Sequence, residues 1–317
     1  GARELFLPFP GWTLPGVFGA GALQALVKQG LPVRGQRVVV AGTGPLLLAV
    51  AALLRSEGAV VPIIFEQARP AALRPFAWAV VRSPSKLLAG IVLRGRLLGV
   101  RYATDSYPVR VTSCPSGLHV EYRAGRRTEA IDCDYLACGF GLIPNTELPQ
   151  LLGCRTTAEG FVQVDGRLAT TVPHVYALGE LTGIGGVDKA LIEGCLAAHA
   201  AAGDEPAAAR LACDHAAAQG FTRRLAAAFT LRPELRKLAQ PDTIICRCED
   251  VPLSAIEHSL SGRDAKLQTR CGMGPCQGRV CGPILQQLLG AEPPQIRPPL
   301  FPTAVGTLAA MFPTATS

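Results

Sequence analysis

The sequence predicts an α/β fold, and three patterns carry that prediction. Residues 37–66 have the pattern of a strand, a helix and a second strand, which together form one βαβ unit of a parallel sheet. Short alternating segments between residues 107 and 132 are separated by turn residues and predict an antiparallel meander. Clustered cysteines between residues 241 and 290 indicate a small metal-binding unit. With 317 residues, of which 49% are hydrophobic, the chain is long enough for two domains with a buried core.

Composition and charge exclude several classes of protein. The net charge of +7 is modest for this length, and no basic run is interleaved with aromatic residues, so no nucleic acid is expected as a partner. The longest apolar run, residues 38–54, is interrupted by Gly-Thr-Gly-Pro, so no transmembrane segment is expected. The eleven cysteines are odd in number and mostly single, which favours a reducing cytoplasm over a disulfide-bonded secreted protein.

The βαβ unit contains a glycine motif for binding a nucleotide. Gly42 and Gly44 follow the first strand directly and open the helix, which places a pyrophosphate at the helix N-terminus. Glu66 ends the second strand, where its carboxylate is predicted to accept hydrogen bonds from ribose hydroxyls and to favour NAD over NADP. Leu47 occupies the third glycine position, so the helix lies further from its strand than in the full motif. A structural β-turn-α unit without a ligand is the alternative.

A later strand, loop and helix indicate a flavin site. Residues 71–99 are predicted to be helical, YLACGFGLIPN to be a buried strand, and 161–203 to hold a strand pair, a glycine loop and a helix over 188–202. In HVYALGE, Gly179 and Glu180 resemble the Gly-acid pair that ends the late strand of two-dinucleotide flavoproteins beside the flavin. The following helix would then direct its positive end at the flavin ring. An ordinary β-turn is the alternative.

Cysteines in two short loops are predicted to hold a [2Fe-2S] cluster. Cys246 and Cys248 form a C-x-C pair, and Cys276 and Cys281 form a C-x4-C pair. Cys271 and Cys276 have the same C-x4-C spacing, so a ligand set with Cys271 in place of Cys281 is the alternative. Zinc is the main competing metal, but structural zinc sites favour C-x2–4-C pairs on hairpin turns.

The remaining cysteines and all the histidines occur singly. The cysteines are expected to be small buried hydrophobic residues, and the histidines receive no role because they show no ligand spacing. These residues are Cys114, Cys133, Cys138, Cys154, Cys195, Cys213, His119, His174, His199, His215 and His258.

Six stretches taken together closely resemble one family of flavoproteins. They are GARELFLPFPGW, VVVAGTGPLLLA, GFGLIPNTEL, YALGELTGIGGVDKALIEG, CRCEDV and TRCGMGPCQGRVC. The family is the FAD/NAD(P)-binding alpha subunit of heteromeric amine dehydrogenases and oxidases, which includes opine oxidase, hydroxyproline dehydrogenase and the flavoprotein subunit of hydrogen cyanide synthase. The last two stretches resemble the bacterioferritin-associated ferredoxin type of [2Fe-2S] domain.

The resemblance implies a fold, ligands, cofactors and a partner. The fold is α/β, two-dinucleotide-binding and pyridine nucleotide-disulfide oxidoreductase-like, with a small helical C-terminal [2Fe-2S] domain. Cys246, Cys248, Cys276 and Cys281 match the cluster ligands, and Cys271 matches a neighbouring non-ligand position. The implied cofactors are FAD, the [2Fe-2S] cluster, and NAD(P) or another adenine nucleotide. The implied partner is a substrate-oxidising flavoprotein beta subunit in a hetero-oligomer, and no catalytic residue is expected in this chain.

The predicted domain organisation follows from the patterns and the resemblance. Since no FAD-binding G-x-G-x-x-G precedes GARELF, a missing N-terminal segment is expected. The predicted units are a remnant of an FAD-binding domain (1–31), an NAD(P)-binding-like Rossmann domain (32–145), a second part of the FAD-binding domain (146–203), a helical connector (204–240), a [2Fe-2S]-binding domain (241–290) and a proline-rich tail (291–317). Residues 292–306 of the tail are expected to be extended.

The predicted function is that of an electron-transfer flavoprotein subunit. Its complex is expected to oxidise an amine or amino acid of the opine, hydroxyproline or glycine type and to pass electrons between FAD and the cluster. One alternative is an NAD(P)H-dependent reductase that delivers electrons through the cluster to an external acceptor. The non-enzymatic alternative is a cluster-bearing scaffold with a structural nucleotide. The expected location is the cytoplasm, with attachment to the inner face of the membrane as an option.

Overall fold

A five-stranded parallel sheet organises the first half of the chain in the computed structural model, which describes residues 1–259, 261–291 and 296–311. The strand order is β2-β9-β3-β4-β5, and every neighbouring pair is parallel. The strands are β2 (Val17–Gly19), β3 (Val38–Gly42), β4 (Ile63–Glu66), β5 (Arg101–Ala103) and β9 (Tyr135–Gly139). The predicted βαβ unit is therefore present as β3, α2 (Leu46–Ser56) and β4.

The sheet is buried on both faces, as its β-branched strands predict. All five residues of β3 are buried, and Val38 and Val40 pack with Leu47 of α2 and Leu23 of α1 (Ala20–Lys28) on one face. On the other face, Val39 and Ala41 join a second core with the meander. The βαβ unit thus holds Gly42 and the start of α2 at the carboxyl edge of the sheet.

The predicted antiparallel meander is present beside this sheet. Its strands are β6 (Ser106–Cys114), β7 (Gly117–Ala124) and β8 (Arg127–Cys133), paired in the order β6-β7-β8. Leu118, Val120 and Tyr122 alternate on β7 and are all buried, because one face of the meander covers the core. Tyr122 stacks on Phe65 of β4, with ring centroids 4.2 Å apart.

The strand pair predicted over residues 161–178 is largely absent. The structure has isolated bridges there, between Val164 and Thr170 and between Ala169 and Tyr176 among others. The Asp165 carboxylate accepts hydrogen bonds from the backbone N–H groups of residues 167 and 169, which closes a tight turn and shortens any ladder. The helix that follows is present as α6 (Val187–Ala201), preceded by the 3-10 turn η1 (Gly179–Thr182).

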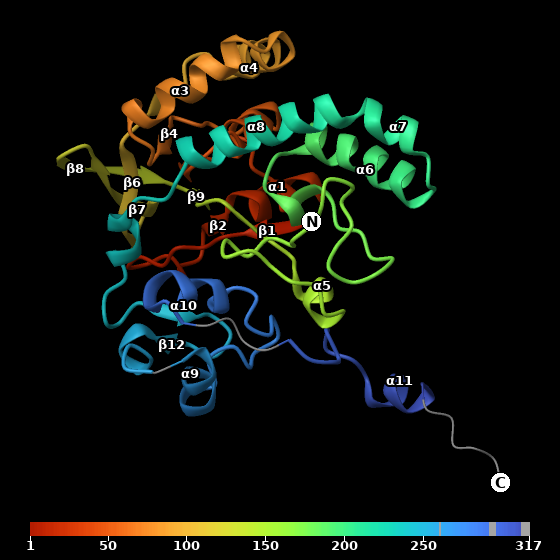
Figure 1. The fold of residues 1–317 in the computed structure, drawn as a ribbon. Helices are drawn as coiled ribbons and strands as arrows, with labels where there is room; N and C mark the ends of the chain where they lie inside the picture. The colour runs from red at the N-terminus through yellow and green to blue at the C-terminus, as the bar shows by residue number, and fades with distance from the viewer. Residues whose placement is uncertain (260, 292–295, 312–317) are drawn as a thin grey trace.

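The regions predicted to be helical are helical. They contain α3 (Pro70–Val81), α4 (Pro84–Arg96), α7 (Glu205–Arg210), α8 (Ala212–Ala228) and the 3-10 helix η2 (Pro233–Lys237). The connector helix α8 lies between the α3–α4 pair and α6 (Figure 1), and Phe76 of α3 packs against Phe221 and Phe229 at its end. Two further strands and a short helix complete this part: β1 (Ala2–Glu4) pairs with β10 (Leu142–Pro144), and α5 (Glu147–Leu151) follows.

The cysteine-rich region is small and folds against the N-terminal segment. Its elements are β11 (Ile244–Cys246), β12 (Val251–Pro252), η3 (Leu253–Ala255), α9 (Gly262–Thr269) and α10 (Cys281–Leu289). The Trp12 indole N–H donates to the carbonyl of Ile244 over 2.6 Å, and Ile245 and Ile284 share one hydrophobic core with Phe9. The prediction of an extended segment was wrong at residues 305–306, where α11 (Val305–Ala310) begins; residues 292–295 and 312–317 lie outside the described residues. The domain boundaries stay predictions, and β2 of segment 1–31 joins the sheet of segment 32–145.

Gly42 is the position where the sheet tolerates no side chain. Its φ is +139°, and a Cβ there would lie 1.9 Å from the carbonyl oxygen of Gly139. We expect Gly42→Ala to lower the free energy of unfolding by more than about 4 kcal/mol, because β3 and β9 would have to separate. Gly44→Ala is the matched control: φ is +95°, but no atom lies within 4 Å of the new Cβ, so the loss should be about 1–2 kcal/mol. Equal losses in urea unfolding would contradict this account.

Candidate functional site

The glycine loop after β3 is closed by its own acidic residue. The Glu66 side chain is 0% exposed, and its carboxylate accepts from Thr43 Oγ1 and the Gly44 N–H, each over 2.8 Å. It also accepts from the Ala68 N–H over 2.9 Å and the Tyr102 hydroxyl over 3.3 Å. Burial raises the pKa of Glu66 even though these hydrogen bonds lower it. Gly42, Gly44 and Glu66 therefore meet at the predicted place, but the carboxylate faces the loop, so its role toward a ribose stays a prediction.

A segment of the connector covers the neighbouring strand end. The Gln67 side-chain amide donates to the carbonyl of Thr230 over 3.2 Å. Arg232 pairs with Asp105 and donates to the Gln67 carbonyl over 3.4 Å. These contacts cross the carboxyl edge of β4, where nucleotides bind in open α/β sheets. A nicotinamide nucleotide would have to share this edge with residues 230–232.

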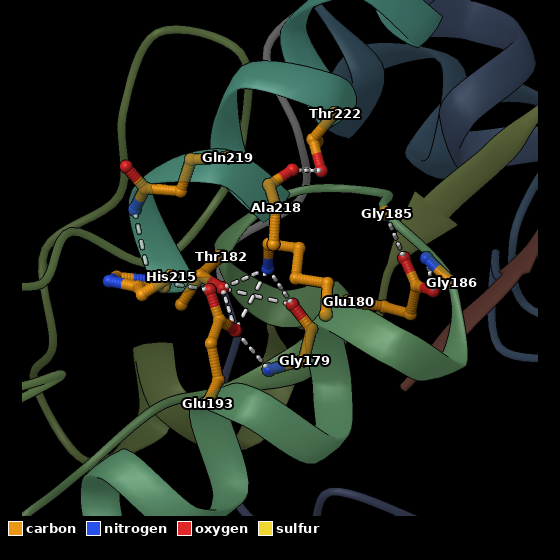
Figure 2. A network of polar contacts seen from close by, with 11 residues as sticks. Gly179, Glu180, Thr182, Gly185, Gly186, Glu193, His215, Ala218, Gln219 and Thr222 are labelled. Atoms are coloured by element: carbon orange, nitrogen blue, oxygen red, sulfur yellow. Dashed lines mark hydrogen bonds and ion pairs between the residues drawn. The ribbon is translucent and has the colours of Figure 1, made fainter. Parts of the chain in front are cut away.

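The predicted flavin-side pair, Gly179 and Glu180, lies in a rigid turn. The Gly179 N–H donates to Glu193 over 2.7 Å, and the Gly179 carbonyl accepts from Lys189 over 2.7 Å. The Glu180 carboxylate accepts from the Gly185 and Gly186 N–H groups, which fixes the loop before α6 (Figure 2). Both predicted residues thus set the backbone at the start of α6.

A buried ionic network behind this turn was missed by sequence reasoning. Lys189 is 2% exposed and Glu193 is 0% exposed, and their ion pair spans 2.8 Å. Thr182 donates to Glu193 over 2.8 Å, and His215 of α8 meets the other Glu193 oxygen over 3.1 Å. Figure 2 shows the acid pointing between the turn and α8. The i, i+4 spacing of Lys189 and Glu193 was the signal that could have marked the pair.

Five cysteines converge in the C-terminal region. The Sγ atoms of Cys246, Cys271 and Cys281 all lie within 4.8 Å of one another, and all three side chains are buried. A tetrahedral metal with metal–sulfur bonds of ~2.3 Å separates its thiolates by about 3.8 Å, so this cluster has nearly the spacing of a metal site. The site thus contains Cys271, which the resemblance treats as a neighbour; the predicted ligand set stays a prediction.

Cys248, which is exposed, and Cys276, which is half-buried, contact each other beside these three. The Cys276 backbone N–H lowers the pKa of Cys248, but desolvation and the neighbouring Cys276 thiol outweigh it and leave the pKa raised. Gly274 is needed beside them, because a Cβ there would lie 2.2 Å from Cys248 Cβ. The Cys271 thiol and burial raise the pKa of Cys281, so this thiol is protonated without a metal. A donor set of soft thiols in a glycine-lined pocket fits an iron–sulfur cluster or zinc.

The single cysteines and histidines differ from expectation at three places. Cys133, Cys138 and Cys154 are buried as predicted, and burial raises the pKa of Cys133 to about 12. Cys195 and Cys213 are exposed, because both lie on solvent faces of their helices. His215 is buried in the network of Glu193, which the sequence left without a role.

The chain is similar to known flavoprotein families. Residues 1–203 match the family model for pyridine nucleotide-disulphide oxidoreductases. The chain is 34% identical to an opine oxidase subunit of Rhizobium meliloti (strain 1021), over 98% of this chain and 74% of that protein. It is 33% identical to the corresponding opine oxidase subunit of Agrobacterium tumefaciens (strain Ach5), over 94% of this chain and 64% of that protein.

A hydrogen cyanide synthase subunit and a solved reductase structure are also similar to this chain over most of its length. The hydrogen cyanide synthase subunit HcnB of Pseudomonas protegens is 30% identical over 89% of this chain and 66% of its own length. The chain thus spans about two thirds of the length of several relatives. Among solved structures, thioredoxin reductase of T. acidophilum superposes with a TM-score of 0.49 at 21% identity, over 65% of this chain and 64% of that chain.

Loss of the buried cation should destabilise the turn strongly. Lys189→Ala leaves the carboxylate of Glu193 buried with one fewer donor, so we expect the free energy of unfolding to fall by about 3–5 kcal/mol. Arg167→Ala breaks an exposed pair with Glu205 and should cost less than about 1 kcal/mol. Urea unfolding of both variants measures the difference. A loss for Lys189→Ala no larger than that of the control would show that the pair does not stabilise the fold.

Proposed function

Because the chain belongs to the pyridine nucleotide-disulphide oxidoreductase family, together with the opine oxidase and hydrogen cyanide synthase subunits described above, we propose that it is an electron-transfer flavoprotein subunit. The chain is an FAD-dependent oxidoreductase of this family. In the proposal, its complex oxidises an amine or amino acid of the opine, hydroxyproline or glycine type. Electrons then pass between FAD and a [2Fe-2S] cluster held near the C-terminus.

The grouping of three buried cysteines, with two more beside them, is the observation that carries the proposal. The five come from β11, the turn after it, the loop before α10 and α10 itself, and the sulfur atoms of Cys246, Cys271 and Cys281 lie within 4.8 Å of one another. Cys248 is exposed and Cys276 half-buried. Grouped thiols without a disulfide are typical of a site whose ligand is a metal. The proposed ligands are Cys246, Cys248, Cys276 and Cys281, which offer the four thiolates that a [2Fe-2S] cluster takes.

The flavin side of the proposal rests on the turn at Gly179. Gly179, Glu180 and the N-terminus of α6 are the residues of this chain proposed to hold FAD. The buried pair of Lys189 and Glu193 fixes their backbone before any ligand arrives, so no ordering is needed on binding. FAD, when bound, supplies the hydride and electron chemistry that no side chain provides.

We propose that substrate oxidation takes place on a partner. Among the described residues, the buried titratable groups next to the Gly179 turn are Glu193, His215 and Lys189. Lys189 and His215 each contact the carboxylate of Glu193. Such groups orient backbone and do not present a free base to a substrate. The partner is then a substrate-oxidising flavoprotein subunit, and the proposed location is cytoplasmic and peripheral to the inner face of the membrane.

Matched cysteine variants test the cluster. Cys248→Ser should lose most of the about two iron atoms and two sulfides per chain, together with the paramagnetic signal of the reduced protein, because one thiolate ligand is gone. Cys271→Ser should keep the iron, the sulfide and the paramagnetic signal. Cys213→Ser, whose cysteine is exposed on α8, is the neutral control. Anaerobic preparation followed by iron, sulfide and zinc analysis and electron paramagnetic resonance gives the readout.

The outcomes separate the ligand set from the function. Full iron in Cys248→Ser with loss of iron in Cys271→Ser would overturn the proposed ligands but keep the cluster. Colourless wild-type protein that contains stoichiometric zinc and no sulfide would overturn electron transfer through this domain.

A further inference from the structure

The helix pair α3 and α4 is apolar, yet none of its described side chains is buried. Trp78 is 65% exposed, Leu88 63% and Ile91 58%, and Val81 and Val92 are also exposed. Isolated exposed apolar residues are ordinary, but a group this large on two successive helices marks an interaction surface. We call these two helices, residues 70–96, the α3–α4 hairpin.

The exposed apolar residues of α4 lie on one stripe. Leu88, Ile91 and Val92 follow the spacing i, i+3, i+4, which places them on one face of the helix. Trp78 and Val81 have the spacing i, i+3 on α3 and share a face in the same way. Such stripes usually pack against another helix or a core. Here they are exposed to solvent, so the partner that covers them is not part of this chain's described residues.

The charge of the hairpin has one sign. Residues 67–104 contain no Asp or Glu, whereas the hairpin itself carries Arg74, Arg82, Lys86, Arg94 and Arg96. An open groove of about 960 Å³ runs between the hairpin and α8 and adds Arg223 and Arg224 on its far wall. Asp188 and Asp214 also line that wall, and Lys86 pairs with Asp188 over 3.2 Å. Trp78 and Arg82 of the hairpin line this groove too, so the exposed surface of the hairpin, including the side that borders the groove, is basic and apolar together.

We propose that the α3–α4 hairpin docks on the surface of an anionic phospholipid bilayer. Exposed tryptophan and aliphatic residues enter the headgroup boundary, and arginine side chains meet lipid phosphates, which is the chemistry of an interfacial helix. An acidic groove on a protein partner would match the charge, but exposed tryptophan and aliphatic stripes on two helices that carry basic and no acidic residues match an extended anionic lipid surface better.

The hairpin lies on the bilayer and does not cross it. In the part of the chain that the structure describes, no single helix has the length and apolar character needed to span a bilayer. α3 and residues 86–96 reach that apolar length only in combination, and they are bent by 117° relative to each other. A bent pair of short helices with its cations spread along both arms suits a position parallel to the membrane plane.

Docking at this end leaves the cysteine region accessible. The hairpin forms one extreme of the molecule, and α9 and α10 lie at the opposite side (Figure 1). A bilayer under the hairpin would thus cover α3 and α4 while the proposed cluster faces away from the lipid. The two proposals use different residues, so vesicle binding can fail while iron content and electron transfer remain normal.

Vesicle binding by the full-length, cofactor-loaded protein tests the inference. We expect co-sedimentation with vesicles of 30% phosphatidylglycerol in phosphatidylcholine, and little with pure phosphatidylcholine. Arg74→Gln with Arg82→Gln should weaken binding roughly twenty-five-fold, at about fivefold for each charge. Leu88→Ser with Ile91→Ser should weaken it at least about tenfold, because two apolar side chains no longer enter the headgroup region.

Matched controls use exposed residues elsewhere. Arg126→Gln with Arg127→Gln removes two exposed charges from the meander, and Leu148→Ser with Leu267→Ser removes two exposed leucines that are 54% and 66% accessible. Both should bind vesicles like the wild type. Trp78 fluorescence should shift to the blue with anionic vesicles, whereas the other tryptophan, Trp12, is only 3% exposed and should not respond.

Three results would overturn the inference. The first is equal binding to neutral and anionic vesicles, and the second is equal weakening by the hairpin and control variants. The third is protection of residues 70–96 from hydrogen exchange by a protein subunit of the purified complex in the absence of vesicle binding. That last result would assign the hairpin to a protein interface instead.

Discussion

The buried ion pair between Lys189 and Glu193 is the interaction on which the arrangement of the molecule depends most. Two charges are held out of water on one turn of α6, and the Gly179 N–H and carbonyl and the Thr182 hydroxyl offset the cost of their burial by hydrogen bonding to them. The pair joins three elements: the Gly179 turn, α6 itself, and α8 through His215. Helix α8 ends at Ala228, and residues 229–243 connect it to β11 of the cysteine region. A neutral or apolar replacement would leave α8 without that anchor.

Much of the fold could be predicted because its signals are local. The strand of residues 38–42 and its glycine turn are specified by a β-branched run and by Gly42, whose approach to Gly139 excludes any side chain. The meander followed from alternation and from the turn residues between its segments. The strand pair predicted over residues 161–178 was largely wrong, because a strand pattern does not reveal that the Asp165 side chain closes a turn there. The contact of His215 with Glu193 could not be predicted for a different reason. His215 lies on another helix, and a single histidine forms no spacing pattern that would indicate a partner.

The cysteine region shows what sequence spacing leaves undetermined. Spacing leaves Cys271 and Cys281 as alternative partners of Cys276, and only the family resemblance sets Cys271 apart, whereas the fold groups Cys271 with Cys246 and Cys281. As a free thiol Cys281 remains protonated, since the Cys271 thiol and burial raise the pKa of Cys281. A metal reverses this, because a coordinating thiol is deprotonated and its negative charge is shared with the ion. The metal-free and metal-loaded forms of the pocket therefore differ in charge, and packing of free thiols need not reproduce the final set of ligands.

The state of Glu66 bears on where electrons enter. In the glycine loop, the Gly44 N–H is a group that a dinucleotide pyrophosphate would use, and here it donates to Glu66. A nucleotide must either displace the Glu66 carboxylate or bind beside it. The contact of Gln67 with Thr230 reduces the space for binding beside it. Displacement would leave Glu66 buried without its donors, at a free-energy cost of about 1–3 kcal/mol or more for a charged group. The Gly44 N–H already has a hydrogen-bond acceptor in Glu66, so the glycine loop is also a sound structural support. That balance favours entry of electrons from a substrate-oxidising partner over entry from a nicotinamide nucleotide.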